Sequence, residues 1–226
     1  MAFSHGQNSR SGESFLCANA NPSFALDAFD YSGTGTTWVD SVGTNNATLV
    51  DSPTYYTTGP YYFDFNGGSD DWATFSTITF GNGSWTVIIW ANSDSMETSE
   101  HGRLMSNSSG GPVTNSFGMM TDGIAYTNYD GTWNSHYGGT SLSTGTWYQL
   151  VWVNTSSTMI MYLNGSADIA SFDSTTSNGG PCNVVGARWG AASFNGKIAC
   201  VQHFTKTFTA TEVSNTFQSQ RSRFGV

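Results

Sequence analysis

The segment spanning residues 147–165 is apolar at both alternating sets of positions and contains no charged side chain. Residues 147–154 alternate as a strand does, and both sets are mainly apolar, which predicts a strand that is buried on both faces. Residues 158–163 repeat the pattern after the polar stretch 154–157, and a short Ser/Thr link between two such runs predicts an antiparallel hairpin. We expect this hairpin in the middle of a sandwich, with Trp152 buried and with a neighbouring sheet and loops covering both faces.

Short β-like runs separated by turn signals continue along most of the chain. Asp-Gly and Asn-Gly pairs supply the positive φ angles that tight hairpins need. Asp122-Gly123 separates two good strands, which makes it the clearest predicted hairpin turn. This spacing is typical of a β-sandwich or a jelly roll. The predicted strands are residues 61–65, 85–92, 116–121, 124–129, 182–186 and 197–204, and the other predicted turns are Asp130-Gly131, Asn164-Gly165 and Asn195-Gly196.

One helix is predicted at residues 209–224, after the last strand. Thr209 and Glu212 have the spacing of a capping box, and the apolar residues that follow recur on one helix face. Residues 1–13 are polar and lack periodicity, so we expect a flexible N-terminal arm there. We therefore predict an all-β fold, a two-sheet antiparallel jelly-roll sandwich with a short C-terminal helix, formed as a single domain by residues 14–226.

The composition favours a large core and a surface with few charges. The chain has 15 Phe, 10 Tyr and 8 Trp, while charged residues make up only 10% of it, so neutral polar residues must cover the surface. Such a surface is typical of extracellular or virion proteins. A net charge of −9 with only 7 Lys and Arg argues against nucleic-acid binding. No stretch approaches the roughly 20 apolar residues of a membrane span, so we expect no membrane insertion.

The first residues do not resemble a signal peptide, and the number of cysteines is odd. Residues 1–13 lack a basic segment followed by an apolar one, so we expect folding in a cytoplasm. Cys17, Cys182 and Cys200 are then expected as reduced thiols. The first and last strands of a jelly roll are usually neighbours, which would bring Cys17 near Cys200. We expect Cys200 to be buried among aromatic residues and Cys182 to be the more accessible of these two.

Several segments, taken in chain order, resemble strands of a known family. The runs "YYFDFNGGSDDWATF", "WTVIIWAN", "GTWYQLVWVNTSSTMIMYLNG" and "VVGARWGAASFNGKIACVQHFTKTFTATEV" are similar to successive strands of the laminin-G-like branch of concanavalin A-like lectins and glucanases. The opening "LCANANPSF", the run "SGTGTTWVDSVGTNNATLVDSPTY" and the ending "RSRFGV" are similar to laminin-G-like proteins encoded by tailed phages. The resemblance covers residues 14–226 and implies a two-sheet jelly roll. This fold serves lectins, glucanases and structural modules alike.

The sequence lacks the residues that make relatives of this fold hydrolases or calcium-binding proteins. The glucanases carry Glu-x-Asp-x-Glu on one strand, because retaining hydrolysis needs neighbouring carboxylates. None of the four Glu residues, at positions 13, 97, 100 and 212, begins that pattern. Relatives often hold calcium through an Asp on the last long strand, where this chain has Ala199 and Cys200, and Asn19 replaces a second Asp. We therefore predict no catalytic residue, no metal site and no cofactor.

Aromatic and polar residues gather in residues 124–139, "IAYTNYDGTWNSHYGG". Aromatic faces suit the CH groups of a sugar, and nearby amide and carboxylate groups suit its hydroxyls, so this stretch is a candidate site for a neutral glycan. The alternative is that these aromatic residues pack a long loop or form an assembly contact. The candidate glycan-binding residues are Tyr126, Tyr129, Asp130, Trp133, Asn134, His136 and Tyr137.

The resemblance leaves three functions open. The first is a non-enzymatic structural protein of a tailed-phage virion, made in the host cytoplasm, that serves as a surface decoration, fibre or spike component. Its partners would be other virion proteins of the capsid or tail, with host surface glycans as a further partner. The second function is a free-standing carbohydrate-binding module or lectin, and the third is a remote glycoside hydrolase. Virion parts are commonly symmetric, so a homo-oligomer is expected.

Overall fold

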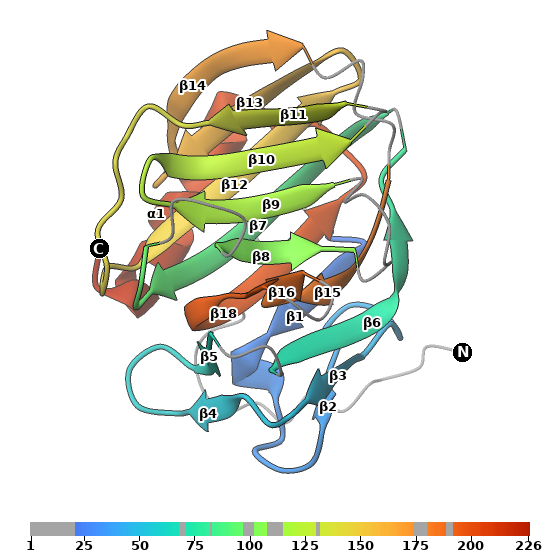
Figure 1. The fold of residues 1–226 in the computed structure, drawn as a ribbon, viewed down its shortest axis with the longest axis vertical. Coiled ribbons are helices and arrows are strands. Elements are labelled where there is room, and N and C mark those ends of the chain that lie inside the picture. The colour runs from blue at the N-terminus through green and yellow to red at the C-terminus, as the bar shows by residue number, and fades with distance from the viewer. Residues whose placement is uncertain are drawn as a thin grey trace.

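In the computed structural model two antiparallel sheets pack face to face, and one helix covers the outer side of the first sheet (Figure 1). This arrangement confirms the predicted jelly-roll sandwich with a C-terminal helix. The predicted arm at residues 1–13, together with Cys17 and Asn19, lies outside the described residues. The structure describes residues 21–67, 71–81, 83–96, 102–107, 115–129, 132–173, 180–188 and 192–226.

Sheet A, the first of the two, contains the predicted central hairpin. Its strands follow the order β14-β13-β12-β7-β18-β5-β4, and β1 pairs with β18 next to β5. The strands are β1 (Phe24–Asp27), β4 (Thr54–Tyr56), β5 (Tyr62–Asn66), β7 (Ser84–Ser93), β12 (Tyr148–Thr155), β13 (Thr158–Leu163), β14 (Ser166–Asp173) and β18 (Asn195–Phe204).

Sheet B faces the viewer in Figure 1 and follows the order β11-β10-β9-β8-β15-β6-β3-β2. A two-stranded ribbon of β16 and β17 is tied to β8, because Ser106 Oγ donates a hydrogen bond of 2.6 Å to Ala187 O. A short 3-10 helix, η1 (Ala28–Asp30), follows β1. The remaining strands are β2 (Thr37–Trp38), β3 (Ala47–Val50), β6 (Trp72–Thr79), β8 (Arg103–Ser106), β9 (Ser116–Met120), β10 (Gly123–Tyr129), β11 (Trp133–Tyr137), β15 (Pro181–Val185), β16 (Ala187–Arg188) and β17 (Ala192–Ser193).

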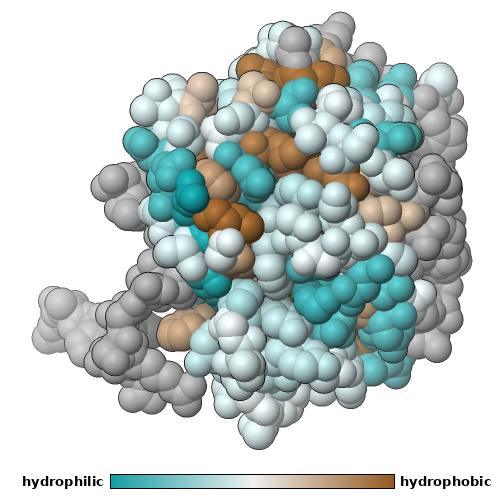
Figure 2. All heavy atoms as spheres, turned by 90° about the vertical axis from the view of Figure 1, so that its left-hand side faces the viewer, coloured by the Kyte–Doolittle hydropathy of each residue, from teal (hydrophilic) through white to brown (hydrophobic). Residues whose placement is uncertain are grey.

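The predicted hairpin forms as β12 and β13 and is buried on both faces. Leu150 lies opposite Leu163, and Asn154 lies opposite Met159. Trp152 is fully buried on the inner face, where its Nε1 donates a hydrogen bond of 3.1 Å to a backbone oxygen of β10. The inner faces of the two sheets form the main core, and its large aromatic side chains stack or meet edge to face across it. The hydrophobic patches in Figure 2 are small and separated by hydrophilic residues, as expected for this composition.

Helix α1 (Ala210–Phe224) covers the outer face of sheet A, a role that we had expected loops to fill. The predicted capping box is present, because Thr209 Oγ1 accepts a hydrogen bond of 3.2 Å from Glu212 N and Glu212 Oε2 accepts one of 2.8 Å from Thr209 N. Near the other end, Arg223 donates two hydrogen bonds of 2.8 Å to the carboxylate of Asp27, which ties the helix to β1. In the part of the chain described, no helix is long and apolar enough to cross a membrane.

Two predicted turns are confirmed. At Asp122-Gly123 the chain turns through residues 121–122, and Gly123 opens β10 with a φ of 128°. Asn164 and Gly165 join β13 to β14 with φ angles of 47° and 80°. Both turns therefore use the left-handed backbone that Asn and Gly tolerate.

The predicted turn at Asn195-Gly196 is wrong, because both residues begin β18. Gly196 has a φ of 147°, and a Cβ atom at this position would lie 2.3 Å from Asn92 O of β7. Glycine is needed here for a close approach of two strands rather than for a turn. The predicted turn at Asp130-Gly131 lies outside the described residues.

Cys182 and Cys200 are both buried. Cys200 packs among aromatic residues of β7 and α1, as expected. The expectation that Cys182 is the more accessible is wrong, since its exposed fraction is 0% against 1% for Cys200. The reason is that β15 lies inside sheet B and directs Cys182 into the main core, where burial raises the pKa of its thiol. The pairing of Asp27 with Cys200 confirms that β1 and β18 are neighbours.

Candidate functional site

The outer face of sheet B carries a row of four residues that crosses four strands, here called the Arg–Tyr row. Arg103 of β8 lies opposite Gly118 of β9, and Gly118 lies opposite Ala125 of β10. Tyr137 of β11 completes the row opposite Ala125. The two middle residues have almost no side chain, so the row has a larger polar group at each end and a flat floor between them.

A second row, the hydroxyl row, runs beside the first. Ser116 of β9 lies opposite Thr127 of β10, and Thr127 lies opposite Ser135 of β11. The hydroxyl oxygens of Thr127 and Ser135 are 3.3 Å apart. Ser116 and Thr127 are buried, whereas Ser135 at the edge of the sheet is exposed.

The alternation of side chains shows that both rows face outward. Successive side chains of a strand point to opposite faces of its sheet. The residues between the row positions belong to the core that fills the space between the sheets, including Phe117 of β9 and both Ile124 and Tyr126 of β10. The rows therefore lie on the other face, which is the face of sheet B that no strand of sheet A covers.

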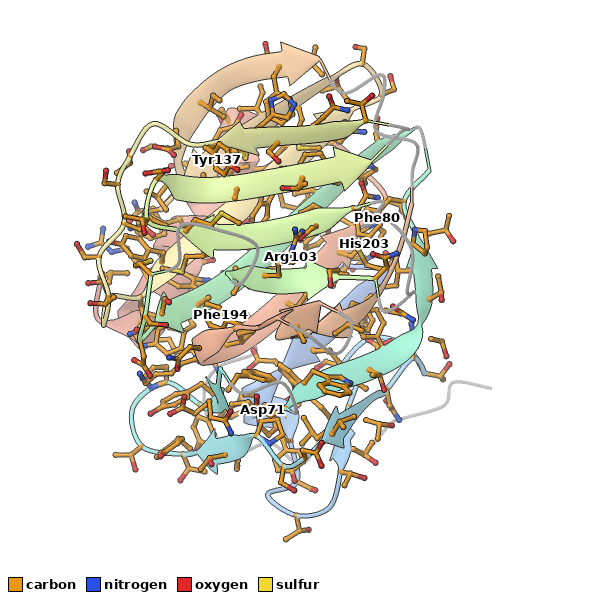
Figure 3. All side chains as sticks on the ribbon, viewed as in Figure 1. Asp71, Phe80, Arg103, Tyr137, Phe194 and His203 are labelled. Atoms are coloured by element: carbon orange, nitrogen blue, oxygen red, sulfur yellow. The ribbon has the colours of Figure 1, made fainter. Side chains whose placement is uncertain are left out.

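Arg103 and Tyr137, labelled in Figure 3, have different exposures but lie within electrostatic reach of each other. Tyr137 is 43% exposed, and Arg103 is 2% exposed. Burial lowers the pKa of the Arg103 guanidinium to about 10, and the interaction with Tyr137 opposes this shift. Arg103 is therefore charged at neutral pH and can act only as a hydrogen-bond donor.

This arrangement suits a sugar better than an ion or a nucleotide. The exposed hydroxyl of Ser135 can donate and accept hydrogen bonds, whereas Arg103, Ser116 and Thr127 are buried behind it. The exposed ring of Tyr137 offers a face to sugar CH groups. The site is therefore concentrated at the β11 edge, where Ser135 and Tyr137 meet solvent.

The structure corrects one of the predicted glycan-binding residues. Tyr126 is 1% exposed, and its hydroxyl donates a hydrogen bond of 2.5 Å to Asn115 Oδ1 in the core. The prediction treated the whole stretch as available, but alternation along β10 directs this side chain inward. Tyr126 is therefore a core residue.

The other predicted residues are spread over different surroundings. His136 lies opposite Tyr126, its ring stacks on Phe172 of β14 at 3.8 Å, and burial lowers its pKa, so it packs between the edges of the two sheets. Asn134 Nδ2 donates to Thr132 O at 3.3 Å. Tyr137 lies in the Arg–Tyr row. The backbones of Tyr129 and Trp133 pair, but their side chains, and the whole of Asp130, lie outside what the structure describes.

Most members of the two rows were missed by the sequence analysis, which considered only residues 124–139. Ser116 and Gly118 lie in a run that the sequence predicts as a strand, so their alternation with Phe117 was a usable signal. Arg103 begins a short strand of four residues that has no periodic pattern of its own. Its place beside Gly118 follows from strand order, which the sequence does not show.

The described strands of sheet B contribute no carboxylate to this face. The strands of sheet B, within the bounds given above, contain no Asp or Glu. Among the residues that the structure describes, no group of three His, Cys, Asp or Glu side chains could hold a metal ion. At the positions where relatives place a calcium ligand, Ala199 and Cys200 are buried in the apolar cluster under α1. The described part of the site thus offers no acid pair for hydrolysis.

Comparison with known families gives one match. Residues 66–214 match the model of the concanavalin A-like lectin/glucanase superfamily in its laminin-G-like form. Residues 66–214 span more than half of the chain, including all of β8 to β17 and therefore every member of both rows. No curated protein sequence matches the chain.

Solved structures with the same fold share little sequence with this chain. Domain 4 of an extracellular arabinanase from Geobacillus stearothermophilus, in complex with arabinotriose, is 13% identical with a TM-score of 0.68, and the match covers 88% of this chain and 99% of that domain. The botulinum neurotoxin serotype G binding domain is 15% identical with a TM-score of 0.66 over 89% of this chain and 52% of that one. A Trypanosoma rangeli sialidase is 15% identical with a TM-score of 0.59, and the match covers 92% of this chain and 35% of the sialidase. This chain therefore spans about half of the toxin domain and about a third of the sialidase.

Proposed function

Because the chain belongs to the concanavalin A-like lectin/glucanase superfamily, we propose that it is a non-enzymatic protein that binds a glycan on the outer face of sheet B. The observation that carries this proposal is the Arg–Tyr row beside the hydroxyl row. At the β11 edge they present the exposed ring of Tyr137 and the exposed hydroxyl of Ser135, with the buried polar side chains of Thr127, Ser116 and Arg103 farther along the rows. A face that served only to pack against another layer of this protein would be apolar.

The lack of carboxylates in sheet B supports binding without hydrolysis. Glycoside hydrolysis of the usual kind needs two carboxyl groups on either side of the scissile bond, about 5–10 Å apart. Among the four Glu residues, only Glu212 lies in the described part, and it caps α1 on the far side of sheet A. The arabinanase domain of the same fold and nearly the same length was solved with arabinotriose, which makes short neutral oligosaccharides reasonable first ligands to test.

We further propose that the protein works as a component of a tailed-phage virion, as a decoration, fibre or spike protein that is made in the host cytoplasm and assembles as a homo-oligomer with capsid or tail proteins. The support is the similarity of "LCANANPSF" and "RSRFGV" to laminin-G-like phage proteins, and the low content of charged residues. Binding to host surface glycans would give such a part a role in attachment. The alternative is a free-standing carbohydrate-binding module.

The binding proposal is tested with the full chain on an array of neutral and acidic glycans, followed by titration calorimetry with arabinotriose and with each glycan that binds. We expect Tyr137→Ala to weaken binding about tenfold, because one stacking contact is lost. Val42, which is 40% exposed away from sheet B's outer face in the loop after β2, provides the matched control as Val42→Ala. Unchanged affinity in Tyr137→Ala, or release of reducing sugar from any bound glycan, would contradict the proposal.

The virion proposal has its own test. Particles purified from a culture that expresses this chain are digested and analysed by mass spectrometry. Recovery of its peptides in a fixed ratio to the major capsid protein is the expected result. If the chain stays in the soluble fraction and is missing from intact particles, it is a free-standing binding protein.

A further inference from the structure

The outer face of sheet A carries an exposed aromatic pair beyond the end of α1. Tyr56 of β4 lies opposite Tyr62 of β5, and their rings stack with centroids 4.9 Å apart and an interplanar angle of 17°. Tyr62 in turn meets the edge of Trp147 at 5.7 Å. Tyr56 is 40% exposed, and Tyr62 and Trp147 are half-buried. Because each ring rests on the next, the exposed ring of Tyr56 is held in place before any ligand arrives.

A row of polar side chains lies beside this pair on the same face. Thr54 of β4 lies opposite Asp64 of β5, and Asp64 lies opposite Lys197 of β18. The neighbouring positions Phe63 and Ile198 point into the main core, so these polar residues point outward. Lys197 also forms an ion pair with Asp94. Hydroxyl, carboxylate and ammonium groups are thus within one or two strands of the stacked tyrosines.

The end of the helix explains why this part of sheet A is open. Gly225 ends α1 in the left-handed conformation with a φ of 70°, and Phe224 makes the last contact with Trp147 at 5.1 Å. Strands β4 and β5 lie past this point, at the opposite end of the sheet order from β14 (Figure 1). Tyr62 of β5 packs at the border of the cluster that contains Phe217 and Phe224 of α1, whereas the edge strand β4 lies one strand farther from the centre of the sheet.

Exposure also sets Tyr56 apart. Among the described residues, the large hydrophobic side chains that are clearly exposed are Val39, Val42, Tyr56 and Tyr137. Tyr137 belongs to the Arg–Tyr row of sheet B. Tyr56 is thus the one other exposed aromatic ring of this set, and it also stands beside hydrogen-bonding groups on a flat strand surface. A cross-strand tyrosine pair alone contributes only about 0.2–1 kcal/mol to a sheet, which gives folding little reason to keep the pair at the surface.

We propose that Tyr56, Tyr62, Asp64 and Lys197 form a second glycan site, on the outer face of sheet A. A sugar ring stacks on the open face of Tyr56, the Asp64 carboxylate accepts hydrogen bonds from its hydroxyls, and Lys197 donates to its oxygens. The ligand is a neutral sugar, because Asp64 and Asp94 outnumber Lys197 and would repel a carboxylate or sulfate. The site does not depend on the first one, since the two lie on opposite sheets and at opposite ends of the strand orders.

The experiment uses the full chain and titrates it with arabinotriose, xylotriose, maltotriose and cellotriose. The proteins compared are wild type, Tyr56→Ala, Tyr137→Ala and the double variant, with Val42→Ala as the control. For at least one sugar we expect two sites per chain in wild type and one in each single variant, or an affinity about tenfold lower at the lost site. Tyr56→Phe keeps the ring and should bind as wild type does. If Tyr56→Ala does not fold, Asp64→Ala is used instead, and it should also lose sugar binding at the second site.

Each outcome decides between the two sites. Loss of binding in Tyr137→Ala with unchanged binding in both Tyr56→Ala and Asp64→Ala would overturn the second site and leave the first. Loss in Tyr56→Ala alone would support the second site and overturn the first. Wild-type protein that binds none of the four trisaccharides, or binds an acidic trisaccharide more tightly through Lys197, would overturn the second site as stated.

Discussion

The outer faces of the two sheets are made of different side chains and serve different purposes. On sheet A, Ile88, Trp90, Val151 and Val153 point outward, and none is more than 1% exposed, because α1 lies on them. On sheet B the outward positions that form the two rows on β9 to β11 hold Ser, Thr, Gly, Ala and Tyr, and Met120 lies at the end of β9 on the same side. Strands that are apolar on both faces therefore need an apolar second layer, whereas sheet B has small and polar side chains on its outer face, of which Ser135 and Tyr137 at the β11 edge are exposed.

This difference assigns stability and binding to separate surfaces. Full burial of a Val, Ile or Trp side chain contributes on the order of 1.5–3 kcal/mol, so the helix-covered face is closely linked to folding. The exposed residues Ser135 and Tyr137 at the edge of sheet B lie outside the main core, so we expect their substitution to change stability little. The proposed second site lies at the border of the helix-covered region, on β4, β5 and β18 of sheet A. A protein with one glycan site on each sheet could bind a glycan-covered surface with an avidity above either single affinity.

The largest predicted effect is that of Trp90→Ala, which tests the contrast on the helix-covered face of sheet A. The ring of Trp90 stacks on Phe224 at 3.9 Å, and its Nε1 donates a hydrogen bond of 2.7 Å to Gln220 Oε1, so its loss leaves a cavity under α1. We expect the free energy of unfolding to fall by about 3–5 kcal/mol in urea titrations followed by circular dichroism. Ser135→Ala on sheet B is the control and should change it by less than about 0.5 kcal/mol. Similar losses in both variants would show that the two faces do not differ.

The second-largest loss of stability is expected from breaking the ion pair between Asp27 and Arg223, which holds the end of the helix to sheet A. Asp27→Asn removes the charge that compensates Arg223, and both side chains are almost completely buried. We expect a loss of about 3–4 kcal/mol in the same assay, because a buried charge is left without its counter-charge. Lys206→Gln breaks the exposed pair with Glu212 and should cost less than about 1 kcal/mol. Equal losses in Asp27→Asn and Lys206→Gln would mean that burial of the first pair has no energetic consequence.

The contrast between the faces also explains what the sequence could predict. The hairpin of residues 147–163, the capping box and the approximate bounds of the predicted strands follow from local patterns, and the structure confirms them, but strands such as β6 and β14 were not predicted. The helix as the cover of sheet A was not predicted, although Val213 and Phe217 carried the needed apolar stripe, because the sequence does not say which face a helix packs on. The Asn195-Gly196 error has the same origin, since glycine suits both a turn and a close strand contact.

The candidate site was predicted less well than the fold. Tyr126 and Tyr137 look equivalent in the sequence, yet one is in the core and the other is exposed, because they lie on opposite faces of paired strands. Alternation alone could have separated them once the strand bounds were fixed. Arg103 and Gly118 become neighbours of Tyr137 only through the order of strands in sheet B, which depends on contacts between distant parts of the chain.

A third prediction concerns pH and compares a histidine inside the sandwich with one at the edge of sheet B. His203 of β18 is 4% exposed, its Nδ1 lies 2.7 Å from Ser23 Oγ, and its buried Nε2 has no hydrogen-bond partner among the described residues. Burial lowers its pKa to about 4. The unfolded chain, where the pKa is about 6.5, therefore binds more protons than the folded chain between pH 6.5 and 4, so stability falls as the pH is lowered through this range.

The expected loss from His203 is about 3 kcal/mol between pH 7 and 4, measured as the free energy of unfolding at each pH. His203→Phe keeps the ring contact with Phe80 and should remove most of this dependence. His136→Gln is the control, because His136 is only partly buried and should contribute much less. If the stability of His203→Phe falls with pH as steeply as that of wild type, protonation of other groups causes the pH dependence.

The smallest effect is expected at the start of α1, and it tests whether the covered face and the binding face are independent. Thr209→Ala removes the hydroxyl that accepts a hydrogen bond from Glu212 N, so one backbone donor of the first turn loses its partner. We expect a loss of about 1 kcal/mol in the free energy of unfolding, while Thr209→Ser keeps the oxygen and should lose only a few tenths. Glycan affinity on sheet B should be the same in both variants, since α1 lies on the far side of sheet A. A change in that affinity would mean that the helix and the binding face are coupled through the core, in which case the two surfaces could not be altered separately.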